Sequence, residues 1–277
     1  MASEPPLKEY LVEPGSRVRL GKGDPTDTTG FKGGKKEGKK VIDSLIGKLD
    51  PLQELLYSEH KQKVLVVLQG TDSSGKDGTI RRAFEGVNPE GVRVAHFGKP
   101  SEEELSHDYL WRAHKQVPEN GEIVIFNRSH YESVLVDGVH NLVPEKIWSK
   151  RYRQITDFER MLNEEGTTVL RFFLHIDKKE QARRFQGRLD DPTKHWKFSC
   201  LDCSERTYWK DYTTAYVDAL EKTSTERAPW YVVPSNHAWF MDLVVSHSIV
   251  KSLGGLGMKY PKLDSVKARL TAGKEPT

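Results

Sequence analysis

The chain has 277 residues, of which 36% are hydrophobic and 30% are charged. That apolar content supports a packed core beneath a charged surface, and it excludes a disordered chain, a collagen-like repeat and a disulfide scaffold. The net charge is +3 and the pI is near 8.6, which is below the value of about 9 typical of a dedicated nucleic-acid domain. We therefore expect no nucleic-acid partner.

The sequence contains no pattern that would place the chain in a membrane. The longest apolar runs, residues 64–68 and 169–174, are far shorter than the roughly 18 residues that a membrane span needs. The first residues show no basic stretch followed by an apolar one, so no secretory signal is visible. The two cysteines, Cys200 and Cys203, cannot staple a domain of this size. We expect a cytoplasmic protein without a membrane partner.

The beginning of the chain is rich in glycine and lysine. Residues 21–40 contain six of each and almost no apolar residue, which predicts a flexible arm over residues 1–42. The arm would be solubilising, or its lysines would tether a polyanion. A helix is expected from Asp43 as N-cap, because leucines then recur at helical spacing. These are Leu45, Leu49, Leu52 and Leu56.

Beyond residue 60, short apolar runs alternate with amphipathic segments. Strands are expected at 64–68, 92–97, 123–126, 168–176 and 230–233. Helices are expected at 77–85, 102–116, 144–165, 178–189, 205–222 and 239–253. This order implies an α/β fold with a parallel five-stranded sheet between two helical layers. We predict one domain over 1–277, with its core at about 60–260 and a polar tail at 264–277.

A glycine-rich loop follows the first of these strands. Gly70, Gly75 and Lys76 have the spacing G-x-x-x-x-G-K, between a predicted strand and a predicted helix. In such a loop successive backbone N–H groups and the helix N-terminus surround an anion, and the lysine neutralises phosphate oxygens. The loop residues expected to bind phosphate are Gly70, Ser73, Ser74, Gly75, Asp77 and Gly78, with Lys76 as a catalytic residue.

Two acidic residues distinguish this loop from the usual form. The position after Lys76, which normally holds a Ser or Thr ligand of Mg²⁺, is Asp77. Asp72 lies within the loop, where a carboxylate beside phosphates needs a cation or a proton. We expect Asp72 to bind Mg²⁺ or to orient the acceptor phosphate, and the alternative is an Asx turn that stabilises the loop.

The strand at 123–126 also ends in polar residues. Asn127 stands where a Walker-B carboxylate is normally found, and Arg128 and Glu132 follow. Arg128 would face the crevice at the carboxyl ends of the strands and bind phosphate, with a structural ion pair as the alternative. Because asparagine supplies no charge, Glu132 would join Asp72 as a metal ligand. Ser129 and His130 do not predict a hydrolase triad, since no nucleophile elbow is present.

The helix expected at 178–189 is strongly basic. Asp177 and Glu180 suggest a capping box, and Pro192 lies beyond its end. Arg184 and Arg188 lie four residues apart on one face, as expected of a lid over about 178–212 that clamps phosphoryl groups. The alternative is a solvated face whose arginines pair with neighbouring carboxylates.

Several ordered motifs together resemble the polyphosphate kinase 2 family, P-loop kinases that use inorganic polyphosphate as phosphoryl donor. The resemblance covers about residues 60–260. It rests on GTDSSGKDGTIRR, HFGKPSEEELSHDYLWR, IVIFNRSHYESVLV and RRFQGRLDDPTKHWKFSCLDCSERTYWKDY. It implies a P-loop kinase fold, catalytic roles for Asp72, Lys76 and Arg128, and a lid containing Arg184 and Arg188.

The resemblance also indicates the substrates. Asn127 with Glu132 is similar to the subgroup that phosphorylates both nucleoside mono- and diphosphates, which assigns these residues to the acceptor. The expected reaction is a reversible, Mg²⁺-dependent transfer from polyphosphate to AMP or ADP, with GMP or GDP as further acceptors, in a homodimer or homotetramer. A polymeric donor needs a basic track beyond the loop. Its candidates, each of which could instead be a surface charge, are Arg81, Arg82, Lys99 and Arg112.

Other interpretations remain open at this point. The main alternative is an ATP-dependent nucleotide kinase of the thymidylate-kinase kind, and a GTP-driven switch is disfavoured because no N-K-x-D motif occurs. Cys200 and Cys203 have zinc-knuckle spacing, but without a second pair we expect free thiols. The stripe of Trp209, Tyr212, Tyr216 and Leu220 is expected to pack in the core rather than stack on a base.

Overall fold

The computed structural model describes residues 5–21, 23–197 and 204–262. A six-stranded sheet runs through the molecule in the order β1-β6-β5-β2-β4-β3. Five strands are parallel, and the short β1 pairs antiparallel with β6 at one edge. The strands are β1 (Leu11–Val12), β2 (Lys63–Gln69), β3 (Val92–His96), β4 (Ile123–Asn127), β5 (Thr167–His175) and β6 (Trp230–Pro234).

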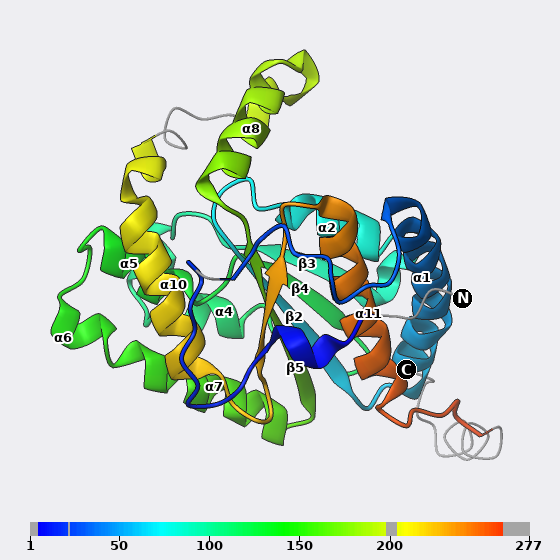
Figure 1. Ribbon diagram of the computed structural model, residues 1–277. Coiled ribbons are helices and arrows are strands. Elements are labelled where there is room, and N and C mark those ends of the chain that lie inside the picture. Colours follow the sequence, from blue (N-terminus) through cyan, green and yellow to red (C-terminus); the bar gives the residue numbers. More distant parts are fainter. Residues whose placement is uncertain (1–4, 22, 198–203, 263–277) are drawn as a thin grey trace.

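Helices cover both faces of the sheet, so the predicted three-layer α/β/α class is confirmed (Figure 1). One face carries α1 (Lys35–Glu59), α2 (Lys76–Ala83) and α11 (Ala238–Gly254). The other carries α4 (Trp111–His114), α5 (Glu132–Val139), α7 (Arg151–Glu164) and α10 (Trp209–Thr223). Helix α8 (Lys178–Leu189) follows β5 and projects from the carboxyl edge of the sheet (Figure 1). The remaining short helices are α3 (Glu102–Leu105) and α6 (Glu145–Trp148), with the 3-10 helices η1 (Leu7–Tyr10), η2 (Pro89–Gly91), η3 (Pro192–Lys197) and η4 (Arg206–Tyr208).

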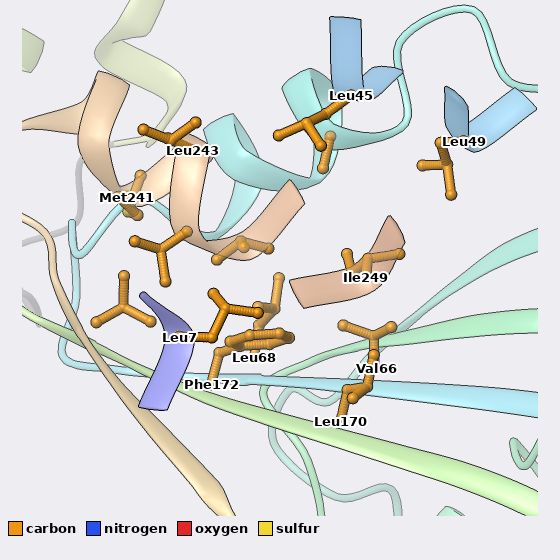
Figure 2. Close-up of a cluster of buried hydrophobic side chains, with 14 of the residues drawn as sticks. Leu7, Leu45, Leu49, Val66, Leu68, Leu170, Phe172, Met241, Leu243 and Ile249 are labelled. Atoms are coloured by element: carbon orange, nitrogen blue, oxygen red, sulfur yellow. The ribbon is translucent and has the colours of Figure 1, made fainter. Parts of the chain in front are cut away.

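The core has two halves, one on each side of the sheet. Side chains alternate along β2, so Val66 and Leu68 face α1 and α11 whereas Leu65 and Val67 face the opposite helices. Figure 2 shows the first half, in which strand residues meet leucines from α1 and α11. Because β2 is buried on both faces, its sequence is a continuous apolar run. This arrangement holds the end of β2, and therefore the glycine-rich loop, in a fixed position.

The N-terminal part of the chain differs from the prediction. The sheet has a sixth strand, β1, because residues before the expected core pair with β6. Leu7, Tyr10 and Phe31 are buried in the core, so the described part of 1–42 is not an arm separate from it. The glycine- and lysine-rich composition of this part of the sequence gives no indication of these few apolar contacts.

The prediction that a helix begins at Asp43 is wrong. Helix α1 begins at Lys35, and Glu37 accepts a hydrogen bond from the amide of Gly34. Gly38 lies inside the helix, and a side chain is disfavoured there because a β-carbon would lie 2.5 Å from the Trp239 ring. The predicted leucine face is confirmed, since Leu45, Leu49 and Leu56 are buried and Leu52 packs beside them.

Three predicted helices are divided or shortened. The segment 102–116 forms α3 and α4, because Asp108 accepts from the amide of Leu110 and makes a turn between them. The segment 144–165 forms α6 and α7, and 205–222 begins with η4 before α10. Helix α5 was not expected, since its valines and Gly138 favour other structures; burial of Val134 and Leu135 overrides that preference.

The helix predicted at 178–189 is confirmed. Asp177 caps it by accepting from the amide of Glu180, but the Glu180 side chain binds arginines instead of completing a capping box. Cys200, Cys203 and the tail predicted at 264–277 lie outside the described residues. No helix in the described ranges is long and apolar enough to cross a membrane.

Candidate active site

The glycine-rich loop joins the end of β2 to the start of α2, as predicted. Gly70 has a φ of +153° and Gly75 a φ of +114°, conformations that side chains rarely allow. A β-carbon on Gly70 would also lie 2.8 Å from the carbonyl oxygen of Leu174. Among the described residues, the buried hydroxyl groups of Thr71 and Ser73 have no hydrogen-bond partner. The loop thus presents backbone and hydroxyl groups suited to an oxygen-rich anion.

Lys76 begins α2 and is buried beneath this loop. Its Nζ donates to the carbonyl oxygen of Gly70 at 2.7 Å and to that of Thr71 at 3.3 Å. Burial, together with the charge of Arg128, lowers the pKa of Lys76 to about 8. The ammonium group is therefore held close to the loop. A negative charge added there would favour the protonated form of Lys76.

Arg128 follows β4 and adopts a left-handed backbone with a φ of 60°. Its guanidinium lies 2.6 Å from Asp72 of the phosphate loop and 3.8 Å from Glu132. Burial works against its charge, yet the carboxylates of Glu132 and Asp72 raise the pKa of Arg128 above its usual value. The structure therefore brings Asp72, Arg128 and Glu132 together from two different strand ends.

Asn127, the last residue of β4, contacts the start of α2. Its Nδ2 donates to Asp77 Oδ1 at 2.7 Å, and Lys197 Nζ lies 3.6 Å from Asp77 Oδ2. Burial opposes ionisation, but these two partners lower the pKa of Asp77. Asn127 therefore orients the carboxylate that replaces the usual Ser or Thr after Lys76.

Glu132 lies in the first turn of α5. Burial raises its pKa, although Arg128 and Lys76 favour the charged form. In the described part of the chain no three His, Cys, Asp or Glu residues form a metal-binding cluster. Mg²⁺ needs no such cage when substrate phosphates and water complete its ligands, so the carboxylate oxygens of Asp72 and Glu132, which both contact Arg128, are of the kind that this ion prefers.

The two lid arginines make different contacts. Arg184 donates to the carbonyl oxygens of Ser73 at 2.9 Å and Ser74 at 2.7 Å, and to Glu180. Arg188 donates to the carbonyl oxygen of Lys197 at 3.0 Å, farther along the lid. Arg184 thus joins α8 to the phosphate loop through backbone carbonyl groups. A direct phosphate contact by either arginine stays a prediction.

Three of the four cations predicted for the basic track lie on separate elements, and these are Arg81, Lys99 and Arg112. Arg81 is exposed on α2, and Lys99 is exposed beyond β3. Arg112 on α4 donates to the carbonyl oxygen of Gly98 at 3.1 Å and lies over the ring of Phe97. Gly98 follows β3, the neighbour of β4, so Arg112 is near the same sheet edge. Arg81 shares no described contact with Arg112.

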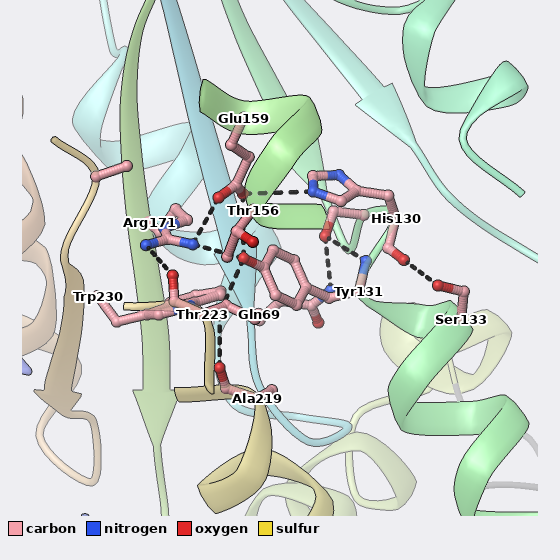
Figure 3. Close-up of polar contacts among 12 residues, drawn as sticks. Gln69, His130, Tyr131, Ser133, Thr156, Glu159, Arg171, Ala219, Thr223 and Trp230 are labelled. Atoms are coloured by element: carbon pink, nitrogen blue, oxygen red, sulfur yellow. Dashed lines mark hydrogen bonds and ion pairs between the residues drawn. The ribbon is translucent and has the colours of Figure 1, made fainter. Parts of the chain in front are cut away.

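A buried polar network lies behind the Arg128 loop (Figure 3). Arg171 of β5 binds Glu159 of α7 at 2.6 Å and donates to the hydroxyl of Tyr131 at 2.5 Å. The same hydroxyl lies 3.1 Å from Glu159 and 3.1 Å from Thr223, so its single proton has two acceptors within hydrogen-bond distance. Tyr131 precedes Glu132 directly, so these bonds fix the chain between Arg128 and Glu132.

Sequence reasoning did not find this network, although one signal was present. Arg171 stands within an otherwise apolar strand, and an arginine that is fully buried requires an acidic partner. Glu159 is that partner, but nothing in the surrounding helix sequence distinguishes it from its acidic neighbours. The contacts of Gln181 with the Asp72 carbonyl oxygen (3.0 Å) and of Thr79 with Asp242 (2.9 Å) were also not foreseen.

The phosphate loop, Lys76 and Arg128 together define a P-loop phosphotransferase. A glycine-rich loop leads from a central parallel strand into a helix that begins with a buried lysine, and an arginine follows the neighbouring strand. The family model for polyphosphate kinase 2 (PPK2) matches residues 32–260. The chain therefore belongs to the polyphosphate kinase 2 family.

Individual relatives agree with this assignment. The chain is 55% identical to an AMP/ADP-polyphosphate phosphotransferase of Meiothermus ruber, over 95% of this chain and 99% of that protein. It is 42% identical to an ADP-polyphosphate phosphotransferase of Rhodopseudomonas palustris, over 92% of both. Among solved structures, polyphosphate kinase 2 from Arthrobacter aurescens TC1 has a TM-score of 0.91 at 40% identity, covering 99% of both chains.

Proposed function

We propose that this protein transfers the terminal phosphoryl group of inorganic polyphosphate to a phosphate oxygen of AMP or ADP. The observation that carries the proposal is the convergence of Lys76, Asp72 and Arg128 at the carboxyl edge of one parallel sheet. Phosphoryl transfer depends mainly on alignment and on cations around the moving group, and this site supplies both. The relatives named above support polyphosphate as the donor.

The reaction exchanges one phosphorus–oxygen bond for another. An oxygen of the acceptor phosphate forms a bond to the terminal phosphorus of polyphosphate, while the bridging oxygen leaves with a chain shorter by one unit. Lys76 and the loop amides would bind the transferred group, and Arg128 would neutralise charge that develops on it. Asp72 orients Arg128 through their 2.6 Å contact. Because the bonds made and broken are alike, we expect the reaction to be reversible.

Mg²⁺ is part of this proposal. Asp72 and Glu132 lie on the two sides of Arg128 and would hold the ion through carboxylate oxygens. When bound, Mg²⁺ would supply positive charge that neutralises phosphate oxygens of the substrates. Activity should be lost in excess EDTA and return when Mg²⁺ is added.

The acceptor is proposed to be either a nucleoside mono- or a diphosphate. The Meiothermus ruber relative is named for both AMP and ADP, and the Rhodopseudomonas palustris relative for ADP alone. Asn127 and Glu132 are the residues to which we attribute this choice, with GMP and GDP as further acceptors to test. A homodimer or homotetramer and a cytoplasmic location remain predictions from the sequence.

The test is an assay without ATP. Purified protein receives long-chain polyphosphate and Mg²⁺ with AMP or ADP in separate reactions, and nucleotides are resolved by chromatography. We expect ADP from AMP and ATP from ADP. If neither forms, whereas ATP phosphorylates AMP or another nucleoside monophosphate, the protein is an ATP-dependent nucleotide kinase and the proposal is wrong.

A further inference from the structure

Gln181, in the first turns of α8, contacts the phosphate loop with one end of its side chain and η4 with the other. Gln181 is buried, with 4% of its surface exposed. Its Nε2 donates to the carbonyl oxygen of Asp72 at 3.0 Å, and its Oε1 accepts from Arg206 Nη1 at 2.9 Å. Arg206 also donates to the carbonyl oxygen of Lys178, at the start of α8, at 3.0 Å. The side chain therefore joins the phosphate loop, α8 and η4, which are three separate segments of the chain.

The two partners of Gln181 determine which end of its amide each of them contacts. A carbonyl oxygen only accepts and a guanidinium only donates, so the NH₂ end faces Asp72 and the oxygen faces Arg206. A glutamate here would lack the donor for Asp72, a lysine would lack the acceptor for Arg206, and a methionine would lack both. One planar amide thus links the position of η4 to that of the phosphate loop.

Gln181 and Arg184 together hold three successive carbonyl groups of the phosphate loop. The two residues lie three positions apart and share one face of α8. Gln181 binds the carbonyl oxygen of Asp72, and Arg184 binds those of Ser73 and Ser74. The carbonyl group and the N–H of one planar peptide unit point in opposite directions. These contacts therefore turn the amide that follows each carbonyl group away from α8.

Two of these amides matter most for binding an anion. The amide of Ser74 donates to the carbonyl oxygen of Thr71 at 3.1 Å, which completes a turn within the loop. The amides of Ser73 and Gly75 follow the carbonyl groups that Gln181 and Arg184 hold at Asp72 and Ser74, so α8 sets the orientation of both. Such amides bind phosphate oxygens in a glycine-rich loop.

The backbone of Ser73 needs this support. Its φ of 62° lies in the left-handed region, which a non-glycine residue occupies only where its surroundings impose it. The carbonyl groups on both sides of its α-carbon are held by α8, that of Asp72 by Gln181 and that of Ser73 itself by Arg184. Loss of the Gln181 contact would free the peptide unit between Asp72 and Ser73 to rotate.

We propose that Gln181 is a positioning residue for phosphoryl transfer, which is held in place by Arg206 and aligns the amide of Ser73 with the donor phosphates. The inference rests on the proposed function, because it concerns how the same loop binds its donor. Asp72 is then fixed through two different groups, its carboxylate by Arg128 and its carbonyl oxygen by Gln181. Gln181 acts through this backbone group rather than by contact with a substrate.

The experiment is a double-mutant cycle in the full chain. The variants are Gln181→Met, Arg206→Met and the two combined, and Gln186→Met is the matched control. Gln186 lies on the same helix, but it is exposed and its amide donates to Asp190. Isothermal titration calorimetry measures the Kd of tripolyphosphate, and steady-state kinetics with polyphosphate and ADP measure kcat and KM. A smaller folded fraction changes the number of binding sites but not Kd, so Kd separates positioning from stability.

We expect Gln181→Met to bind tripolyphosphate about fivefold more weakly and to lower kcat about tenfold, because a misaligned amide stabilises phosphate oxygens less well. The KM for ADP should stay within about twofold of wild type, since Gln181 contacts neither Asn127 nor Glu132. Gln186→Met should stay within about twofold of wild type in all three quantities.

The cycle tests whether Arg206 acts through Gln181. Arg206→Met should weaken tripolyphosphate binding about threefold in the wild-type background and have no further effect once Gln181 is methionine. An Arg206→Met effect of equal size in both backgrounds would mean that Arg206 acts independently of Gln181 and would overturn the inference. Wild-type Kd and kcat in Gln181→Met, or equal losses in Gln186→Met, would overturn it as well.

A second variant is used if circular dichroism shows that Gln181→Met does not fold. Gln181→Glu retains an acceptor for Arg206 and lacks the donor for Asp72, with Gln186→Glu as the control for the added charge. The same weakening is expected, and wild-type affinity for tripolyphosphate would overturn the inference. Failure of the proposed function is seen separately, as absence of nucleotide phosphorylation by wild type with polyphosphate, whereas the affinity for tripolyphosphate tests the alignment whichever donor the enzyme uses.

Discussion

Arg128 and Asp72 form an ion pair at 2.6 Å although 56 residues separate them in the sequence. The pair joins the end of β4 to the phosphate loop after β2. In this pair Arg128 adopts a left-handed backbone, a conformation that costs a non-glycine residue on the order of 1–3 kcal/mol. Strain of this kind persists where the surroundings impose it, and here those surroundings are the candidate active site.

Replacing Lys76 tests its place at the reacting phosphate. Lys76→Ala should lower kcat by about 10²–10³-fold, equivalent to about 2.7–4 kcal/mol of barrier, by analogy with loss of one preorganised donor. Lys76→Arg should restore only part of the rate, since a planar guanidinium does not fit a site shaped for a point charge. Steady-state kinetics with polyphosphate and ADP measure both. Activity of Lys76→Ala within threefold of wild type, about 0.65 kcal/mol, would remove Lys76 from the mechanism.

The pH dependence follows from the burial of Lys76. Its pKa is lowered to about 8, so the free enzyme loses this positive charge as the pH rises through that value. We expect kcat/KM for polyphosphate to fall above about pH 8, whereas an unperturbed lysine would keep its charge to about pH 10. Bound phosphate stabilises the charged form, so kcat should decline only at higher pH. A kcat/KM profile that is level to pH 10 would contradict the assignment.

The buried pair of Arg171 and Glu159 should be important for both stability and turnover. Glu159→Gln leaves the Arg171 charge buried without its counter-ion and should reduce the free energy of unfolding by about 3–5 kcal/mol. Glu164→Gln on the same helix is the control, because Glu164 is exposed and its ion pairs are worth about 0–1 kcal/mol. Urea denaturation measures both values.

A second variant separates lost charge from lost packing. Arg171→Met/Glu159→Leu replaces the pair by apolar side chains, which in other proteins recovers stability. It should be more stable than Glu159→Gln but still have reduced kcat, because Tyr131 loses two of the contacts that hold the segment between Arg128 and Glu132. Wild-type kcat in this double variant would show that the network does not position the site.

The sequence predicted the features that depend on local patterns. The phosphate loop was found because glycines, lysine, strand and helix are adjacent in the chain, and the apolar runs located the five parallel strands. The Arg171–Glu159 pair and the β1–β6 pairing were missed, since each joins residues whose own neighbourhoods give no sign of the partner. The start of α1 was missed because a segment rich in lysine and glycine is typical of a flexible arm, whereas here it forms a helix that packs against Trp239.

Asn127→Asp tests the contact between β4 and α2. The new carboxylate would replace the Nδ2 group that now lies 2.7 Å from Asp77, so two like charges would meet and the pKa of the pair would rise. The variant should lose about 1–3 kcal/mol of stability at neutral pH, and the loss should shrink as the pH falls, because the folded pair takes up a proton.

Exchanging the two groups provides the control for that variant. Asn127→Asp/Asp77→Asn restores one amide and one carboxylate at the contact, so its Tm should remain close to that of wild type between pH 5 and 8, whereas Asn127→Asp alone should approach wild type only at the acidic end. A Tm difference for Asn127→Asp that is independent of pH would mean that the two carboxylates do not meet.

The most direct measurement follows the phosphoryl group itself. Polyphosphate labelled with ³²P is incubated with unlabelled ADP and Mg²⁺ in the absence of ATP, with wild type and Lys76→Ala in parallel, and the label is traced after nucleotide separation. We predict that wild type places the label in the terminal phosphate of ATP and that Lys76→Ala does so at least about 10²-fold more slowly. Label that remains in polyphosphate or appears only as free phosphate with wild type would contradict the account.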